Sequence, residues 1–169
     1  MAIRSRIEHT FSWWHQGVFL YDRTYEWSED SRELTEAASG EWLDQSISGG
    51  VTYISPGGAV FGSDDAPLAI EVHDTSPPPP ADDAESVGEF DLVLPSGELV
   101  MEESGGGSDD NVVILPPGEW RARWSGFGEA RAEELEAAGT DAGAQRPDRY
   151  LLQLWPRAQP AGVARIRGY

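Results

Sequence analysis

The sequence contains no cysteine and no lysine among its 169 residues. Without cysteine, the chain has no disulfides, no thiolate metal ligands and no cysteine nucleophile. A chain without disulfides suits a reducing compartment. Without lysine, it has no phosphate-binding loop of the G-x-x-x-x-G-K-[ST] type. All 12 basic residues are therefore arginines.

Long hydrophobic runs are also missing. No window approaches the roughly 20 apolar residues that a membrane-spanning helix needs. The opening residues, MAIRSRIEHTFSWW, mix charged and apolar side chains and are not followed by the apolar run of a secretory signal. We therefore expect a cytoplasmic protein that does not enter a membrane.

Basic residues are absent from the whole stretch between Arg32 and Arg121. Residues 33–120 hold 19 of the 30 acidic residues, and the formal net charge is −18. Such a charge repels nucleic-acid phosphates and anionic membrane surfaces, and it attracts a basic protein. The stretch predicts a coherent negative field that meets a basic partner. The alternative is that the acidity serves solubility alone.

Short segments with alternating or β-branched residues recur between turn signals along the chain, and they predict nine or ten strands. The regular β–α–β alternation of a parallel sheet is missing. The pattern predicts an all-β fold, an antiparallel sandwich or partly closed barrel with one or two short helices in loops, forming a single domain over 1–169. The proline-rich segment 76–86 (SPPPPADDAES) is expected to be an exposed connector. Residues 127–148 are expected to be a mobile insertion in a hairpin, with a short helix at 129–138.

Catalytic signatures are not found, since the chain has neither G-x-S-x-G nor HExxH. We expect no enzyme activity and no cofactor. The candidate partner-binding residues are paired carboxylates and one tryptophan pair, because neighbouring residues on a strand point to opposite faces and an exposed Trp is a common interface anchor. These candidates are Asp64, Asp65, Asp82, Asp83, Glu102, Glu103, Asp109, Asp110, Trp13 and Trp14.

Two other functions remain open at this level. The three histidines, His9, His15 and His73, together with Glu71 or Asp74, offer ligands for a metal or a small-molecule site. Alternatively, the Trp13–Trp14 pair and exposed edge strands could make the chain a structural subunit of a larger assembly.

The segments G-E-W-R-A-R at 118–123 and Y-L-L-Q-L-W-P at 150–156 carry a resemblance. They resemble the closing strands of a group of small, uncharacterised bacterial proteins. The acidic, strand-rich layout is also distantly similar to that of ComJ-type competence proteins, which inhibit a DNA-degrading nuclease. The resemblance implies a cytosolic β-sandwich that binds a basic protein such as a nuclease or toxin, as an inhibitor or immunity-type partner.

Overall fold

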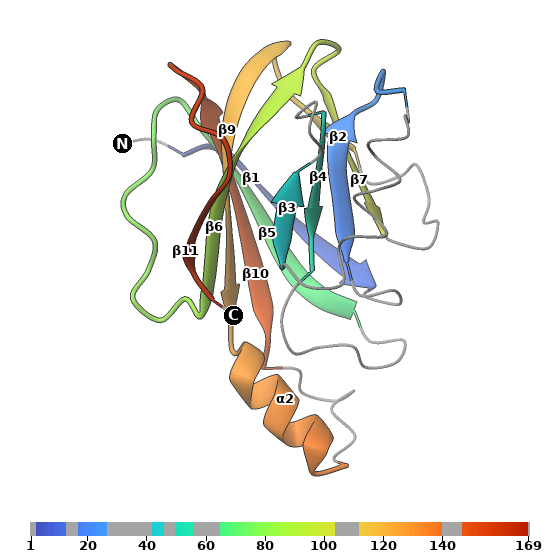
Figure 1. The fold of residues 1–169 in the computed structure, drawn as a ribbon, viewed down its shortest axis with the longest axis vertical. Helices are drawn as coiled ribbons and strands as arrows, with labels where there is room; N and C mark the ends of the chain where they lie inside the picture. Colours follow the sequence, from blue (N-terminus) through green and yellow to red (C-terminus); the bar gives the residue numbers. More distant parts are fainter. Residues whose placement is uncertain are drawn as a thin grey trace.

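The computed structural model describes residues 3–12, 17–26, 42–45, 50–55, 65–103, 112–139 and 147–168. In these residues, two β-sheets face each other and a single described helix lies at one end (Figure 1). The all-β sandwich expected from the sequence is confirmed. None of the helices in this part of the chain is long and apolar enough to cross a membrane.

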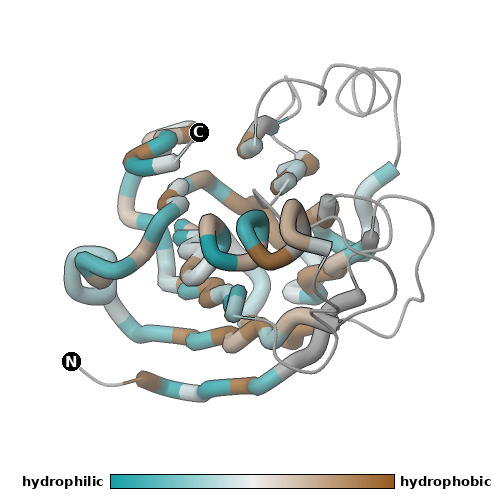
Figure 2. The backbone as a smooth tube through the Cα atoms, turned by 90° about the horizontal axis from the view of Figure 1, so that it is seen from below, coloured by the Kyte–Doolittle hydropathy of each residue, from teal (hydrophilic) through white to brown (hydrophobic). Residues whose placement is uncertain are grey.

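The first sheet has six strands in the order β1-β5-β10-β9-β6-β11. Its members are β1 (Ile3–Ser12), β5 (Asp65–His73), β6 (Ser86–Leu94), β9 (Gly118–Phe127), β10 (Arg149–Pro156) and β11 (Ala164–Arg167). Strand β1 forms one edge and alternates apolar with charged residues, as Figure 2 shows.

The second sheet has five strands in the order β3-β4-β2-β7-β8. Its members are β2 (Val18–Asp22), β3 (Leu43–Gln45), β4 (Val51–Ile54), β7 (Glu98–Glu103) and β8 (Val112–Ile114). Eight of the nine strand pairs in the described residues are antiparallel, and β10 pairs with β5 in parallel. A long connection is needed for a parallel pair, and here the intervening strands supply it.

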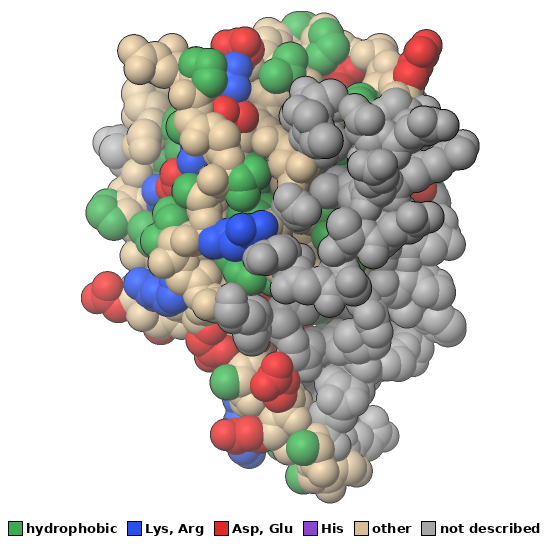
Figure 3. Space-filling view, in the orientation of Figure 1, with side chains coloured by type: hydrophobic (Ala, Val, Ile, Leu, Met, Phe, Trp, Pro, Cys, Tyr) green, Lys and Arg blue, Asp and Glu red, His purple; other side chains and the backbone are tan. Residues whose placement is uncertain are grey.

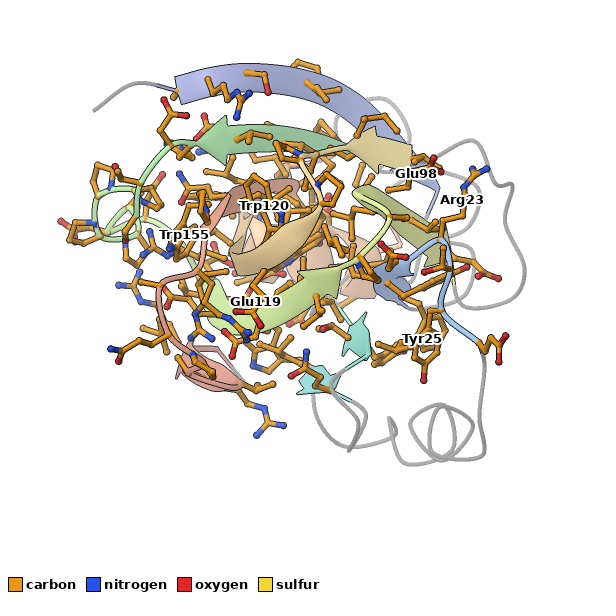
Figure 4. All side chains as sticks on the ribbon, turned by 90° about the horizontal axis from the view of Figure 1, so that it is seen from above. Arg23, Tyr25, Glu98, Glu119, Trp120 and Trp155 are labelled. Atoms are coloured by element: carbon orange, nitrogen blue, oxygen red, sulfur yellow. The ribbon has the colours of Figure 1, made fainter. Side chains whose placement is uncertain are left out.

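The core lies between the two sheets, because one face of each strand carries its apolar residues. Along β9, Trp120, Ala122 and Trp124 point into the core, while Arg121 and Arg123 occupy the opposite, outer face. Figure 4 shows the labelled Trp120 between the sheets and Trp155 on the outer side of the six-stranded sheet. The alternation seen in the sequence therefore gives the correct two faces of this strand.

The short helix α2 (Glu129–Ala137) follows β9 and lies below the sheets in Figure 1. It lies within the helix expected at 129–138, and the flanking strands β9 and β10 pair in register from Phe127–Arg149 to Trp120–Pro156. The sequence also predicts a short helix capped by Ser31 and a hairpin turn at Gly57–Gly58, and both lie outside the described residues.

Gly88 of β6 lies against Leu43 of β3 and the neighbouring Trp42. A Cβ atom built at this position would lie 2.2 Å from Leu43 Cδ2 and 2.7 Å from Trp42 Cη2. Both neighbours are buried, and the rigid Trp42 ring has little room to move. The glycine therefore sets the spacing of the sandwich at β3.

We predict that Gly88→Ala lowers the free energy of unfolding by about 1–3 kcal/mol, because overpacking forces neighbouring groups to shift. Urea unfolding followed by tryptophan fluorescence measures this. Val93→Ala is the control, since Val93 is on the same strand but 48% exposed, and its cost should stay within about 0.5 kcal/mol. Equal stabilities of the two variants would contradict the prediction.

Candidate functional site

A row of polar side chains crosses the outer face of the six-stranded sheet. Strand register aligns Arg6 of β1, Glu71 of β5, Gln153 of β10, Arg123 of β9 and Glu89 of β6. Arg6 Nη1 donates to Glu71 at 2.8 Å, and Gln153 Nε2 donates to the other Glu71 oxygen at 3.0 Å. Arg123 binds Glu89 through Nε at 2.8 Å and Nη2 at 2.7 Å. Each charge in the row therefore has an opposite neighbour.

A second set of ion pairs surrounds Asp91, two residues further along β6. Arg121 Nη1 lies 2.9 Å from Asp91 Oδ1, and Arg157 Nη1 lies 3.0 Å from Oδ2. The backbone N–H groups of Ala161 and Gly162 donate to the same Oδ2 at 2.8 Å each. Burial alone would raise the pKa of Asp91, but these two N–H groups and then Arg121 outweigh it and lower the pKa below the ordinary 3.8.

Arginine side chains also donate hydrogen bonds to the backbone of the connector (residues 76–86) beside this face. Arg123 Nη1 donates to the Pro78 carbonyl at 2.6 Å. Arg167 Nη1 of β11 donates to the carbonyls of Ala81, Asp82 and Ala84. At its far end the connector is tied to α2, since the Glu85 carboxylate accepts the N–H groups of Gly128 and Ala130 at 3.2 Å and 2.7 Å. The connector is therefore held at both ends, although it contains little regular structure.

These contacts correct one expectation from the sequence. The acids of residues 33–120 were expected to lack counter-ions and to form one coherent negative field. Six of them instead pair with arginines from outside that stretch. These six acids are Glu71, Asp83, Glu89, Asp91, Glu98 and Glu119. The physical reason is strand order, because β1 places Arg6 beside Glu71, and β9 places Arg121 and Arg123 beside the acids of β6.

Several exposed acids lie where the connector meets α2. Asp82 and Glu133 are exposed and have no ion-pair partner among the described residues. Asp83 is paired only with Arg149, at 3.4 Å and with both side chains largely exposed, and Glu134 with Arg131 on the helix itself. A shallow depression lined by Glu85, Ala130 and Glu133 joins the two segments. We call Asp82, Asp83, Glu85, Glu133 and Glu134 the connector–helix surface.

The space-filling view agrees with this placement. Figure 3 shows acidic side chains on and just above α2, with a few arginines among them, and further acidic side chains at the upper end of the molecule.

The sequence-predicted residues have different outcomes. Asp82 and Asp83 lie together on the connector–helix surface, while Glu102 sits on β7 and accepts a hydrogen bond from the Tyr21 hydroxyl. Asp65 and Glu103 lie in strands β5 and β7, but their side chains are outside the described set. The remaining candidates lie outside the described residues, namely Asp64, Asp109, Asp110, Trp13 and Trp14.

Glu85, Glu133 and Glu134 were not chosen from the sequence. Part of the signal was present, since a short helix was expected at 129–138, which contains Glu133 and Glu134. What the sequence did not provide is the pairing of β6 with β9, which brings residue 86 beside residue 126 and so joins connector to helix.

The metal hypothesis gains no support from the described residues, in which no group of three or more histidine or carboxylate side chains comes together. His73 is buried, and its Nε2 lies 3.2 Å from Glu71 within the polar row. His9 lies on β1 with its side chain outside the described set, and His15 is outside the described residues.

Comparison with known proteins gives two solved structures with the same architecture. No family model matches the chain, and no curated protein matches its sequence. The structure titled crocagin biosynthetic gene J superposes with a TM-score of 0.58 at 18% identity, covering 93% of this chain and 99% of that one. ComJ from Bacillus subtilis, whose title calls it the inhibitor of the DNA-degrading activity of NucA, has a TM-score of 0.57 at 11% identity, covering 93% and 100%.

The chain shares the fold of ComJ. The distant resemblance expected from the sequence is therefore confirmed as a relationship of fold. At these identities the likeness extends to strand order and layers, and it does not transfer individual contact residues. Neither neighbour is described as an enzyme by its title.

The Asp91 contacts predict how stability responds to mutation and acid. Asp91→Asn should cost about 3 kcal/mol at neutral pH, because Arg121 and Arg157 would stay buried without their carboxylate. A lowered pKa means that Asp91 stabilises the fold above about pH 3.8 and that this contribution is lost as pH falls through the lower folded pKa. Urea unfolding from neutral pH down to pH 2 should show a shallower acid dependence in the variant. An unchanged slope would contradict the assignment.

Arg167 offers a test of how the connector is held. In Arg167→Ala the carbonyls of Ala81, Asp82 and Ala84 lose their donor. The Ala84 amide, which donates to the Ala81 carbonyl at 3.1 Å, should then exchange its hydrogen at least about tenfold faster, since local opening becomes easier. Arg4→Ala, on exposed β1, is the control and should leave this exchange unchanged. Unaltered protection in Arg167→Ala would show that other contacts fix the connector.

Proposed function

We propose that the protein is a binding protein whose connector–helix surface docks on a basic protein, and that it acts as an inhibitor or immunity-type partner of an enzyme such as a nuclease. The observation that carries this proposal is the position of the uncompensated charge. Asp82 and Glu133 have exposed carboxylates with no ion-pair partner in the part of the chain that the structure describes, whereas the acids of the sheet face are neutralised.

The rigidity of the surface supports a docking role. An acidic loop that is free to move must be ordered on binding, and ordering costs free energy. Here Arg167 holds the connector carbonyls and Glu85 holds the first turn of α2. The carboxylates on this surface are therefore largely pre-positioned, which favours association with a rigid basic groove.

Charge also favours fast encounter with such a partner. With a net charge of −18, the long-range field accelerates association with a cationic protein and opposes association with nucleic acid. Once the partner has arrived, only the acids that face it act at short range. An acidic surface that occupies the phosphate-binding groove of a nuclease would block access of DNA.

The fold comparison is consistent with this function. ComJ is titled an inhibitor of a DNA-degrading activity, which is a role carried out by protein binding. A cytoplasmic location and a basic partner follow from the proposal and are part of it.

The proposal predicts the effect of removing two unpaired charges. The purified protein, immobilised at low salt, should capture a basic protein from lysate of its source cells, and mass spectrometry identifies it. Asp82→Asn with Glu133→Gln should weaken binding of the purified partner by about tenfold, chiefly through slower association. If the partner is a nuclease, DNA cleavage in its presence gives a second readout.

The matched control removes two equivalent charges elsewhere. Glu26 and Asp74 are also exposed and without a described ion-pair partner, and Asp74 lies at the opposite end of the connector. Glu26→Gln with Asp74→Asn changes the net charge equally and should leave affinity within about twofold. Equal loss in both double variants, or a captured partner that is acidic, would refute the proposal.

A further inference from the structure

The outer face of the six-stranded sheet has a hollow of about 280 Å³ beside the connector. Register explains its origin, because the row after Arg6 and Glu71 places Glu8, Ala69 and Leu151 side by side. Ala69 is short, so the sheet surface is depressed there. The long side chains of Arg6 and Arg149 stand at its margin.

Both arginines are held in position by the protein. Arg149 lies over the Phe127 ring with its guanidinium carbon 4.5 Å from the ring centre. Arg6 is anchored by the buried Glu71 at 2.8 Å and by Glu8 at 2.7 Å. Because both guanidiniums are about half exposed, they remain open to a further contact.

The lining restricts what this hollow can take. An anion would meet Glu8 and Asp83, and a cation would meet Arg6 and Arg149. Its volume falls below the roughly 300–1,000 Å³ of pockets that bind drug-sized ligands. An uncharged group about the size of one side chain meets no charge of its own sign and fits the volume.

The same lining favours an aromatic group. Arginine guanidiniums stack on aromatic faces, and Ala69 and Leu151 give an apolar floor. The carboxylates of Glu8 and Asp83 can accept a hydrogen bond from a tyrosine hydroxyl or a tryptophan N–H. Aromatic side chains are also common anchors at the centres of protein interfaces.

We infer that this hollow receives one tyrosine or tryptophan side chain of the protein partner. The inference rests on the proposed function, because Asp83 belongs to both the hollow and the connector–helix surface. The acids then guide the partner to the surface, and the aromatic side chain anchors it there.

The test uses N-acetyltryptophanamide and N-acetyltyrosinamide as probes, with methyl-labelled protein observed by NMR. Both probes should shift the Ala69 and Leu151 methyl signals and bind with a Kd in the millimolar range expected for a fragment (about 1–10 mM). Benzoate and N-acetylargininamide should bind at least about tenfold more weakly, since each meets a like charge.

A larger side chain at position 69 fills the hollow, and the same substitution outside the hollow is its matched control. Ala69→Leu should weaken probe binding by at least about tenfold, whereas Ala158→Leu, at an exposed site outside the hollow, should not alter it. Arg149→Gln removes one stacking group and should weaken binding several-fold, and it serves if Ala69→Leu fails to fold.

Several results would overturn the inference. These are an absence of methyl shifts, equal binding to the parent protein and Ala69→Leu, or tighter binding of benzoate than of the aromatic amides. If the captured partner loses affinity with the Asp82/Glu133 double variant but binds Ala69→Leu normally, the hollow is not used and the proposed function stands. If the partner ignores both changes while the probes still bind, the proposed function fails and the hollow remains a site for aromatic groups.

Discussion

The outer face of the six-stranded sheet depends on one constraint, which is that two buried arginines on β9 must be paired with carboxylates. Arg121 and Arg123 alternate with the core tryptophans of the same strand, and both are buried on its outer face. A buried guanidinium is tolerated only when carboxylates and carbonyls satisfy its donors. Glu89 and Asp91 on the neighbouring strand supply the carboxylates, while Pro78 and Gly162 supply the carbonyls.

That requirement explains why two irregular segments lie against the sheet. The connector and the tail between β10 and β11 carry no aliphatic or aromatic side chain larger than valine, so hydrophobic burial contributes little to holding them. Their carbonyl and N–H groups complete the hydrogen bonding of Arg123, Arg121 and Asp91.

Much of the fold followed from the sequence, and the reasons are local. The alternation of Trp120, Arg121, Ala122, Arg123 and Trp124 reflects the two faces of the strand, and the run RYLLQLWP predicts a strand at 149–156, which are the observed bounds of β10. The ion pairs could not be predicted in the same way. Glu89 and Arg123 are adjacent in space because β6 pairs with β9, and nothing in the local pattern encodes that pairing. A charge profile along the chain therefore overstated the field of the folded protein.

The parallel pair of β5 and β10 has a consequence for how the chain comes to be folded. Strand β10 separates β1 and β5 from β9 and β6, although it is made after all four. Until residues 149–156 have left the ribosome, the larger sheet consists of two unconnected halves, and Glu71 has no Gln153 to bind. Folding must then close contacts between distant parts of the chain, which is slow for β-rich topologies. The sandwich is therefore completed only after most of its sequence has been translated.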